Sequence, residues 1–94
     1  MSFKADVAIV TGAASGMGGI YARKLLEGGA KLGAFDMGEE GLNKLQSEFP
    51  DQVLPVLVDI SDADAVTAAV AQVREKWGFV DFVVNAAGIM PTAE

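Results

Sequence analysis

Near the start of the chain lies the stretch Thr11-Gly12-Ala13-Ala14-Ser15-Gly16-Met17-Gly18, called the glycine loop below. It follows a short apolar run, Val7–Val10, and precedes a segment with apolar residues at helical spacing. Glycine permits a tight turn and a close approach of two backbones, because it has no Cβ. The loop therefore predicts a strand that turns directly into a helix from about Gly16 to Glu27, which Gly28-Gly29 ends.

The same alternation continues along the chain. A second strand is expected over Leu32–Phe35, closing on Asp36, and a second helix carries Leu42, Leu45 and Phe49 before Pro50 ends it. A third strand is expected over Val53–Val58. Proline cannot donate to a strand ladder on both sides, so Pro55 places this third strand at an edge of the sheet.

A third helix and a fourth strand complete the pattern. We expect Ser61 to cap the helix, with Asp64 as the third residue of a capping box, and Gly78 to end it after a stripe of Val66, Val70, Val73 and Trp77. The fourth strand is expected over Phe79–Val84. Strands that alternate with helices predict an α/β fold with a parallel sheet and right-handed crossovers.

Composition limits the classes of function. The 94 residues suffice for one domain, and 13 acidic against 7 basic residues give a net charge of −6. Such a charge repels phosphate backbones, so nucleic acid is not expected as a partner. The chain has no cysteine and no histidine, which removes disulfides, thiolate nucleophiles, imidazole bases and the usual zinc ligands. No apolar stretch is long enough to span a membrane, and a cytoplasmic protein is expected.

The glycine loop predicts a phosphate site. A helix N-terminus offers unpaired N–H groups and the positive end of the helix dipole, and side chains there would block a pyrophosphate. Gly12, Gly16 and Gly18 stand where backbone must approach phosphate or where helix must approach strand. Ser15 is expected to bond either a phosphate or ribose of the ligand or its own loop.

An acid at the end of the second strand indicates which dinucleotide binds. Asp36 can accept hydrogen bonds from both hydroxyls of a ribose and would repel a 2′-phosphate. The next residues are Met37-Gly38, with no cation to receive a phosphate. The sequence therefore predicts NAD as the cofactor, in preference to NADP.

The spacing Thr-Gly-x-x-x-Gly-x-Gly resembles the short-chain dehydrogenase/reductase (SDR) family. Asp36 resembles the family's ribose-binding acid, and Asp59-Ile60 resembles the pair that holds the adenine ring. Asn85-Ala86-Ala87-Gly88 resembles its Asn-Asn-Ala-Gly turn, with Ala86 in place of the second asparagine. The resemblance implies a Rossmann-type sheet in the order 3-2-1-4, truncated after the fourth strand, and hydride transfer between NAD(H) and an alcohol or carbonyl substrate.

The predicted cofactor-binding residues therefore come from the glycine loop and from the ends of the second, third and fourth strands. They are Gly12, Ser15, Gly16, Met17, Gly18, Asp36, Met37, Asp59, Ile60, Asn85, Ala86, Ala87 and Gly88. Each has a purely structural alternative: a turn without ligand for the glycines, a solvated carboxylate for Asp36, a turn acid for Asp59 and core packing for Met17 and Ile60. For Asn85, structural support of a strand end is favoured over ligand contact.

The catalytic residues of the family have no counterpart in this chain. The resemblance implies a serine and a Tyr-x-x-x-Lys pair, whereas the single tyrosine, Tyr21, lies in the first helix with Leu25 four places on. We therefore expect residues 1–94 to be the N-terminal cofactor-binding part of a longer enzyme that acts on a small molecule, without hydride transfer of its own. The resemblance also implies a homo-oligomer for the parent enzyme.

Two other functions remain open from the residues. One is a stand-alone module that binds or senses NAD without catalysis. The other is a methyltransferase-type domain for S-adenosylmethionine, which the spacing of the glycine loop and the Asn-Ala-Ala-Gly turn disfavour. If the fourth strand ends the sheet, Phe82-Val83-Val84 forms an open apolar edge, and we expect the chain to self-associate there.

Overall fold

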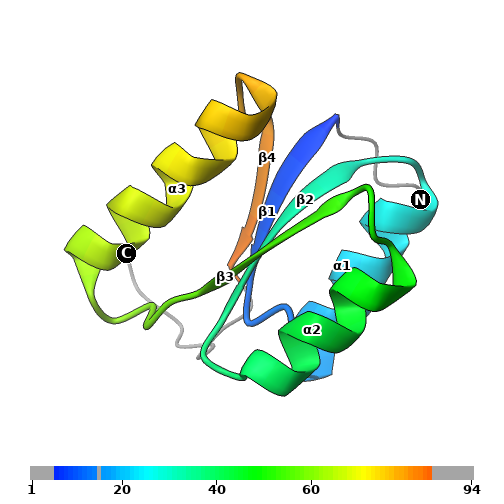
Figure 1. Ribbon diagram of the computed structural model, residues 1–94, viewed down its shortest axis with the longest axis horizontal. Coiled ribbons are helices and arrows are strands. Elements are labelled where there is room, and N and C mark those ends of the chain that lie inside the picture. The colour runs from blue at the N-terminus through cyan, green and yellow to red at the C-terminus, as the bar shows by residue number, and fades with distance from the viewer. Residues whose placement is uncertain (1–5, 15, 86–94) are drawn as a thin grey trace.

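The computed structural model describes residues 6–14 and 16–85 of the chain (Figure 1). Strands and helices alternate along the whole of this part, as the sequence predicts. In chain order the elements are β1 (Val7–Thr11), α1 (Gly16–Glu27), β2 (Lys31–Asp36), α2 (Glu39–Glu48), β3 (Val53–Leu57), α3 (Ala63–Trp77) and β4 (Phe82–Asn85).

The strands form one sheet in the order β3-β2-β1-β4. Every pairing is parallel: Ile9 lies opposite Gly33 of β2 and opposite Val83 of β4, and Ala34 lies opposite Pro55 of β3. The predicted order is confirmed, and Pro55 does lie in an edge strand. Parallel strands need crossover helices, which is why a helix follows each of the first three strands.

Two helices cover one face of the sheet and one covers the other (Figure 1). The residues of α1 and α2 that face the sheet pack on Ala8, Val10, Leu32 and Ala34 in one core cluster. On the other face α3 packs on Ile9, Phe35 and Val56 through a second cluster. The alternation of β1 between the two clusters follows from the two-residue period of a strand.

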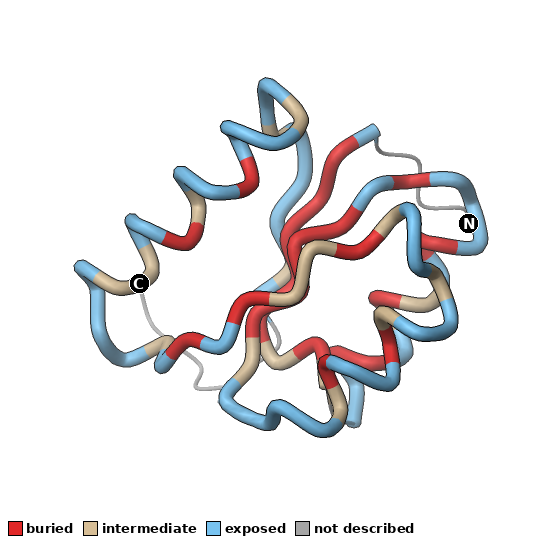
Figure 2. Tube along the Cα trace, in the orientation of Figure 1, coloured by how far each residue is buried: buried red, intermediate tan, exposed pale blue. Residues whose placement is uncertain are grey.

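Burial is concentrated in β1 and β2 and fades toward β4 (Figure 2). All five residues of β1 are buried, whereas no residue of β4 is. Along α3 only Ala69 and Val73 are buried, and the predicted stripe residues Val66, Val70 and Trp77 are half-buried against the second cluster. No helix in the described part of the chain has the length and apolar character needed to cross a membrane.

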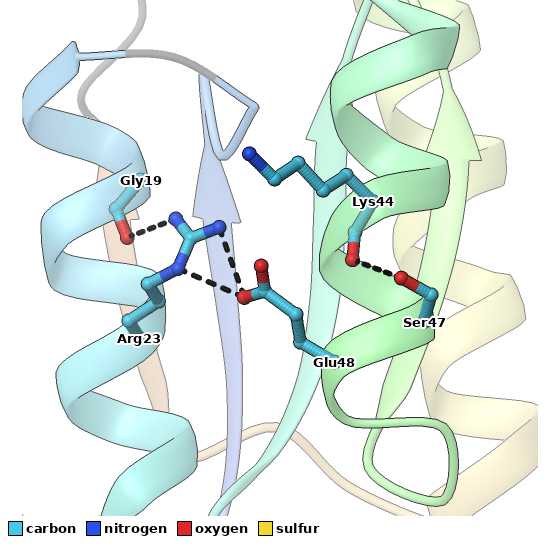
Figure 3. Close-up of polar contacts among 5 residues, drawn as sticks. All are labelled: Gly19, Arg23, Lys44, Ser47 and Glu48. Carbon is cyan, nitrogen blue, oxygen red and sulfur yellow. Dashed lines mark hydrogen bonds and ion pairs between the residues drawn. The ribbon is translucent and has the colours of Figure 1, made fainter.

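α1 and α2 lie side by side and are joined by an ion pair (Figure 3). The Arg23 guanidinium donates to Glu48 Oε1, with both Nε and Nη2 at 3.0 Å, and its Nη1 lies 3.5 Å from the carbonyl oxygen of Gly19. Gln52, in the turn before β3, donates from Nε2 to the carbonyl oxygens of Leu26 and Ala30. These contacts fix α1, α2 and the start of β2 relative to one another.

The cap of α3 differs from the prediction. Asp62, not Ser61, is the N-cap, and its carboxylate accepts from the backbone N–H of Ala65 at 3.1 Å. Ser61 instead donates its hydroxyl and backbone N–H to Asp59 Oδ1. Both residue types are good N-caps, but the hydroxyl of Ser61 is engaged by Asp59 and Asp62 takes the cap position. At the other end Gly78 adopts a left-handed conformation (φ 92°), as the predicted helix end requires.

The fourth strand begins later than predicted, at Phe82 instead of Phe79. The residues between Gly78 and Phe82 carry the chain from the end of α3 back to the sheet. There Asp81 meets the start of β1: its N–H donates to the Val7 carbonyl, and its carboxylate accepts from the N–H groups of Val7 and Asp6 at 2.8 and 3.2 Å. The residues in this contact are more than seventy positions apart in the sequence, so no local sequence pattern predicts it.

Candidate functional site

The predicted site residues that the structure describes gather at one edge of the sheet, because all strands are parallel. Thr11 lies opposite Phe35 of β2 and opposite Asn85 of β4, so the carboxyl ends of these strands meet at the same edge. The crossovers from β1 to β2 and from β3 to β4 run on opposite faces of the sheet (Figure 1). β1 and β4 therefore enclose a topological switch point, where open α/β sheets bind ligands.

The glycine loop has the geometry that its sequence predicts. Gly12 and Gly16 both adopt positive φ, 71° and 53°, which other residues rarely do. A Cβ on Gly18 would lie 2.0 Å from the carbonyl oxygen of Gly12, so only glycine lets α1 start this close to β1. Around a Cβ on Gly16, by contrast, there is open space. The first turn of α1 thus lies close to the end of β1, contains no acidic residue and has open space around Gly16.

The loop is tied to the end of β2 by three backbone donors. The N–H groups of Gly12 and Ala13 both donate to the carbonyl oxygen of Phe35, at 2.8 and 3.2 Å. The N–H of Ala14 donates to Asp36 Oδ2 at 3.0 Å. The glycine loop and Asp36, the acid that the sequence predicts to favour NAD, are therefore in direct contact.

Asp36 is half-buried, and both of its carboxylate oxygens accept hydrogen bonds from backbone. Oδ2 accepts from Ala14, and Oδ1 accepts from the N–H of Gly38 at 2.8 Å. Each carboxylate oxygen has a second lone pair, so the group retains acceptor capacity for a ligand hydroxyl. A ribose bound beside the loop could be recognised by this carboxylate, as the sequence predicts.

Asp59 follows β3 at the same edge and is exposed. Its Oδ1 accepts from the hydroxyl of Ser61 at 2.7 Å and from the N–H of Ser61 at 2.9 Å. These two bonds hold the pKa of the Asp59 carboxyl below its ordinary value, so the group is ionised at neutral pH. The neighbouring Ile60 is half-buried against the second core cluster, on the face of the sheet that α3 covers. Their predicted contact with adenine stays a prediction.

Asn85 ends β4 and joins it to β1. The hydroxyl of Thr11 donates to Asn85 Oδ1 at 2.8 Å, across the strand pair in which these residues are partners. This bond agrees with the structural role that the sequence favoured for Asn85. The sequence motif included Thr11 without assigning it this contact, which only the parallel pairing of β1 with β4 creates.

The remaining predicted residues divide into two groups. Met17 and Met37 are exposed, by 57% and 66%, so core packing does not account for either side chain. Met17 lies within the glycine loop and Met37 directly follows Asp36, so both could form apolar walls beside a bound ligand. Ser15, Ala86, Ala87 and Gly88 lie outside the described residues.

One participant was not singled out from the sequence: the first turn of α2. A Cβ on Gly41 would lie 2.7 Å from Ala14 Cβ and 2.9 Å from the Ala14 carbonyl oxygen, and one on Gly38 would lie 4.0 Å from Ala14 Cβ. The glycine loop therefore rests against α2 as well as against β2. The signal in the sequence is the pair of glycines at the start of an otherwise ordinary helix.

Known proteins resemble the chain along nearly its whole length. The family model for short chain dehydrogenases matches residues 6–94. A 2-(R)-hydroxypropyl-CoM dehydrogenase of Xanthobacter autotrophicus is 39% identical over 92 residues, which are 94% of this chain and 37% of that protein. The chain therefore spans little more than a third of the length of this relative.

Solved structures agree in fold. A short chain dehydrogenase/reductase of Burkholderia phymatum in complex with NAD has a TM-score of 0.80 at 30% identity, over 88% of this chain and 31% of that one. The C-domain of a bacterial malonyl-CoA reductase with NADP has a TM-score of 0.78 at 29% identity, over 89% of this chain and 15% of that one. NAD and NADP thus both occur in structures of this kind. With its glycine loop, its strand order and the match over residues 6–94, the chain belongs to the short-chain dehydrogenase family.

Proposed function

We propose that the chain binds NAD at the carboxyl edge of its sheet, as the cofactor-binding part of a short-chain oxidoreductase. The observation that carries the proposal is the contact between the glycine loop and Asp36 through the N–H of Ala14. A pyrophosphate bound at the loop and a ribose bound at this carboxylate would therefore lie side by side. The pyrophosphate would lie at the first turn of α1, over Gly16, and the adenosine ribose at Asp36.

The choice of NAD over NADP rests on charge. A 2′-phosphate at the end of β2 would meet the carboxylate of Asp36 and the two acids in the first turn of α2, Glu39 and Glu40. The residues that follow Asp36 are Met37 and Gly38, so no cation of this turn would receive the phosphate. Like charges at short distance disfavour binding, which supports NAD.

When bound, NAD supplies a nicotinamide ring that accepts or donates a hydride. The residues of this chain would bind and orient the cofactor: the loop by its backbone N–H groups, Asp36 by accepting ribose hydroxyls, and Asp59-Ile60 beside the adenine. Hydride transfer to or from an alcohol or carbonyl substrate belongs, in this proposal, to the longer protein, in a cytoplasmic setting. Tyr21 is half-buried in α1, and Leu25 stands four residues on where a Tyr-x-x-x-Lys pair needs lysine. Tyr21 is therefore not expected to take part.

Calorimetric titration of the 94-residue chain with NAD, NADP and S-adenosylmethionine tests the proposal. We expect NAD to bind, and NADP to bind at least about tenfold more weakly, since tenfold corresponds to about 1.4 kcal/mol of repulsion. Asp36→Ala removes the repelling carboxylate and should bring the two dissociation constants together. Equal or tighter binding of NADP by the unchanged chain would contradict the choice of cofactor, and tighter binding of S-adenosylmethionine would contradict the class of ligand.

The absence of catalysis by this chain alone is a separate expectation. Incubation of the 94-residue chain with NAD and a panel of alcohols, followed by absorbance of the reduced nicotinamide, should show no turnover above the protein-free control. Any turnover that scales with protein concentration would show that a catalytic group lies within these residues.

A further inference from the structure

We propose that Asp36, together with the first turn of α2, positions the glycine loop before any cofactor binds, so that one carboxylate both shapes the loop and receives the ribose. The part that concerns the ribose rests on the proposed function. The part that concerns the loop rests on contacts within the chain.

The first contact is the pair of hydrogen bonds at Asp36. Oδ2 accepts from Ala14, 22 residues away in the sequence, while Oδ1 accepts from Gly38, two residues on. The bond to Gly38 fixes the carboxylate relative to its own backbone, and the bond to Ala14 transmits that position to the loop. Hydrogen bonds to an ionised acceptor are stronger than those between neutral groups, so this link is well suited to hold a loop.

The second contact is steric and independent of charge. Ala14 lies so close to α2 that a Cβ on Gly41 would come within 2.9 Å of its carbonyl oxygen and 2.7 Å of its Cβ. Ala14 is therefore held from two sides, by the Asp36 carboxylate at its N–H and by the glycine surface of α2 at its side chain and carbonyl.

The arrangement has a consequence for the usual isosteric replacement. An asparagine at position 36 has one acceptor oxygen and one NH₂ group, and in either orientation the NH₂ meets the N–H of Ala14 or of Gly38. Asp36→Asn therefore cannot keep both bonds. Asp36→Ala removes both acceptors, so this substitution, made to change the preference for NAD or NADP, would also release the loop in the absence of a ligand.

Amide hydrogen exchange of the cofactor-free chain provides the first test. Asp36→Ala should speed exchange of the Ala14 amide by at least about tenfold, because its acceptor is lost. Exchange at Val10, buried in β1, should change less and reports global unfolding. Glu40→Ala is the matched control, since it removes the side chain of an exposed acid in the first turn of α2. Unchanged exchange at Ala14 in Asp36→Ala would overturn the proposal.

Ligand binding provides the second test. An NAD analogue without hydroxyls on the adenosine ribose cannot use Asp36 as a ribose acceptor. We expect Asp36→Ala to weaken binding of this analogue severalfold, through the loop alone. Equal affinity of the unchanged chain and the variant for the analogue would show that Asp36 serves only the ribose.

Gly41→Ala tests the steric half without touching the carboxylate. Its Cβ must displace Ala14, so NAD affinity should fall by about fivefold or more and Ala14 exchange should change. Gly19→Ala is the control, because a Cβ there lies 3.5 Å from the Ala13 carbonyl oxygen, an ordinary contact. If Asp36→Ala unfolds the chain, so that Val10 exchanges as fast as Ala14, Gly41→Ala decides the question. An unchanged NAD affinity and unchanged Ala14 exchange in Gly41→Ala would then overturn the proposal.

Failure of this inference and failure of the proposed function give different results. If the chain binds no NAD but Ala14 loses its protection in Asp36→Ala, the positioning role is supported and the assigned cofactor is refuted. A chain that binds NAD through Asp36 but shows unchanged loop exchange retains the proposed function and refutes the positioning role.

Discussion

β1 has a neighbouring strand on each side, and the two sides of the sheet differ in how far they are closed. On the β2 side four consecutive residues, Leu32 to Phe35, are buried. α1 and α2 pack over Leu32 and Ala34 on one face, and α3 packs over Phe35 on the other. On the β4 side Phe82 is 36% and Val83 60% exposed. Within the described residues no strand pairs with the outer edge of β4.

The difference shows where the proposed cofactor site obtains its rigidity. Most contacts of the glycine loop come from the closed side, from Phe35, Asp36 and the first turn of α2. The open side contributes the hydrogen bond from Thr11, the first residue of the loop, to Asn85. The proposed cofactor site is therefore supported mainly from the closed side.

The largest expected effect concerns the close packing of α1 against β1. Gly18→Ala places a Cβ 2.0 Å from the Gly12 carbonyl oxygen, so α1 must move away from β1. We expect the free energy of unfolding to fall by about 3 kcal/mol, measured by urea denaturation, with loss of NAD binding.

The adjacent glycine is the control for this prediction. Gly19→Ala meets only ordinary contacts at 3.5 Å and replaces a helical glycine, so it should stabilise the chain by about 0.5–1 kcal/mol. Equal effects of the two substitutions would show that close approach of α1 to β1 is not what Gly18 provides.

The second prediction addresses the open side. We expect the chain to self-associate through β4, and Val83→Lys to reduce this association, because a lysine on an edge strand disfavours pairing with another edge. Light scattering at increasing concentration measures the effect, and the free energy of unfolding should change by no more than about 0.5 kcal/mol.

The opposite edge strand offers a matched control. Leu57 of β3 is 59% exposed, close to the 60% of Val83, but β3 contains Pro55, which already disfavours edge pairing. Leu57→Lys should therefore leave the association unchanged. An unsubstituted chain that stays monomeric at high concentration would contradict the prediction for both edges.

The smallest expected effect concerns the join between β4 and β1. Hydrogen bonds from the N–H groups of Val7 and then Asp6 hold the pKa of the Asp81 carboxyl below its ordinary value of 3.8. A depressed pKa in the folded state stabilises it above pH 3.8, and this contribution is lost as the pH falls from there through the folded-state pKa. Asp81→Asn should reduce the loss of unfolding free energy that occurs as the pH falls below 3.8. Urea denaturation at a series of pH values measures this loss.

The control for this last prediction is Asp51→Asn, at an exposed acid in the turn before β3. We expect Asp51→Asn to reduce the acid-induced loss of unfolding free energy less than Asp81→Asn does. If both variants reduce this loss equally, general charge repulsion and not the contact of Asp81 with β1 governs stability in acid.

Much of the fold could be predicted because its signals are local. Gly78 ends α3 through its own backbone conformation, Pro55 excludes β3 from the middle of the sheet, and the three glycines of the loop mark the entry into α1. The family resemblance also lies in short motifs of this kind. None of these inferences requires knowledge of a residue distant in the sequence.

The predicted cap of α3 was wrong for a local reason, because Ser61 bonds to Asp59 and Asp62 takes its place. The other differences depend on residues far apart in the sequence. The start of β4 depends on Asp81 meeting Val7, and the orientation of Asp36 depends on Ala14 lying within 3.0 Å of its carboxylate. The sequence by itself determined the order of elements, the glycine loop and the identity of the acid beside it. Only the tertiary structure decided which backbone groups that acid holds, because hydrogen-bond partners far apart in the chain are chosen by the packing of β1, β2 and α2 against one another.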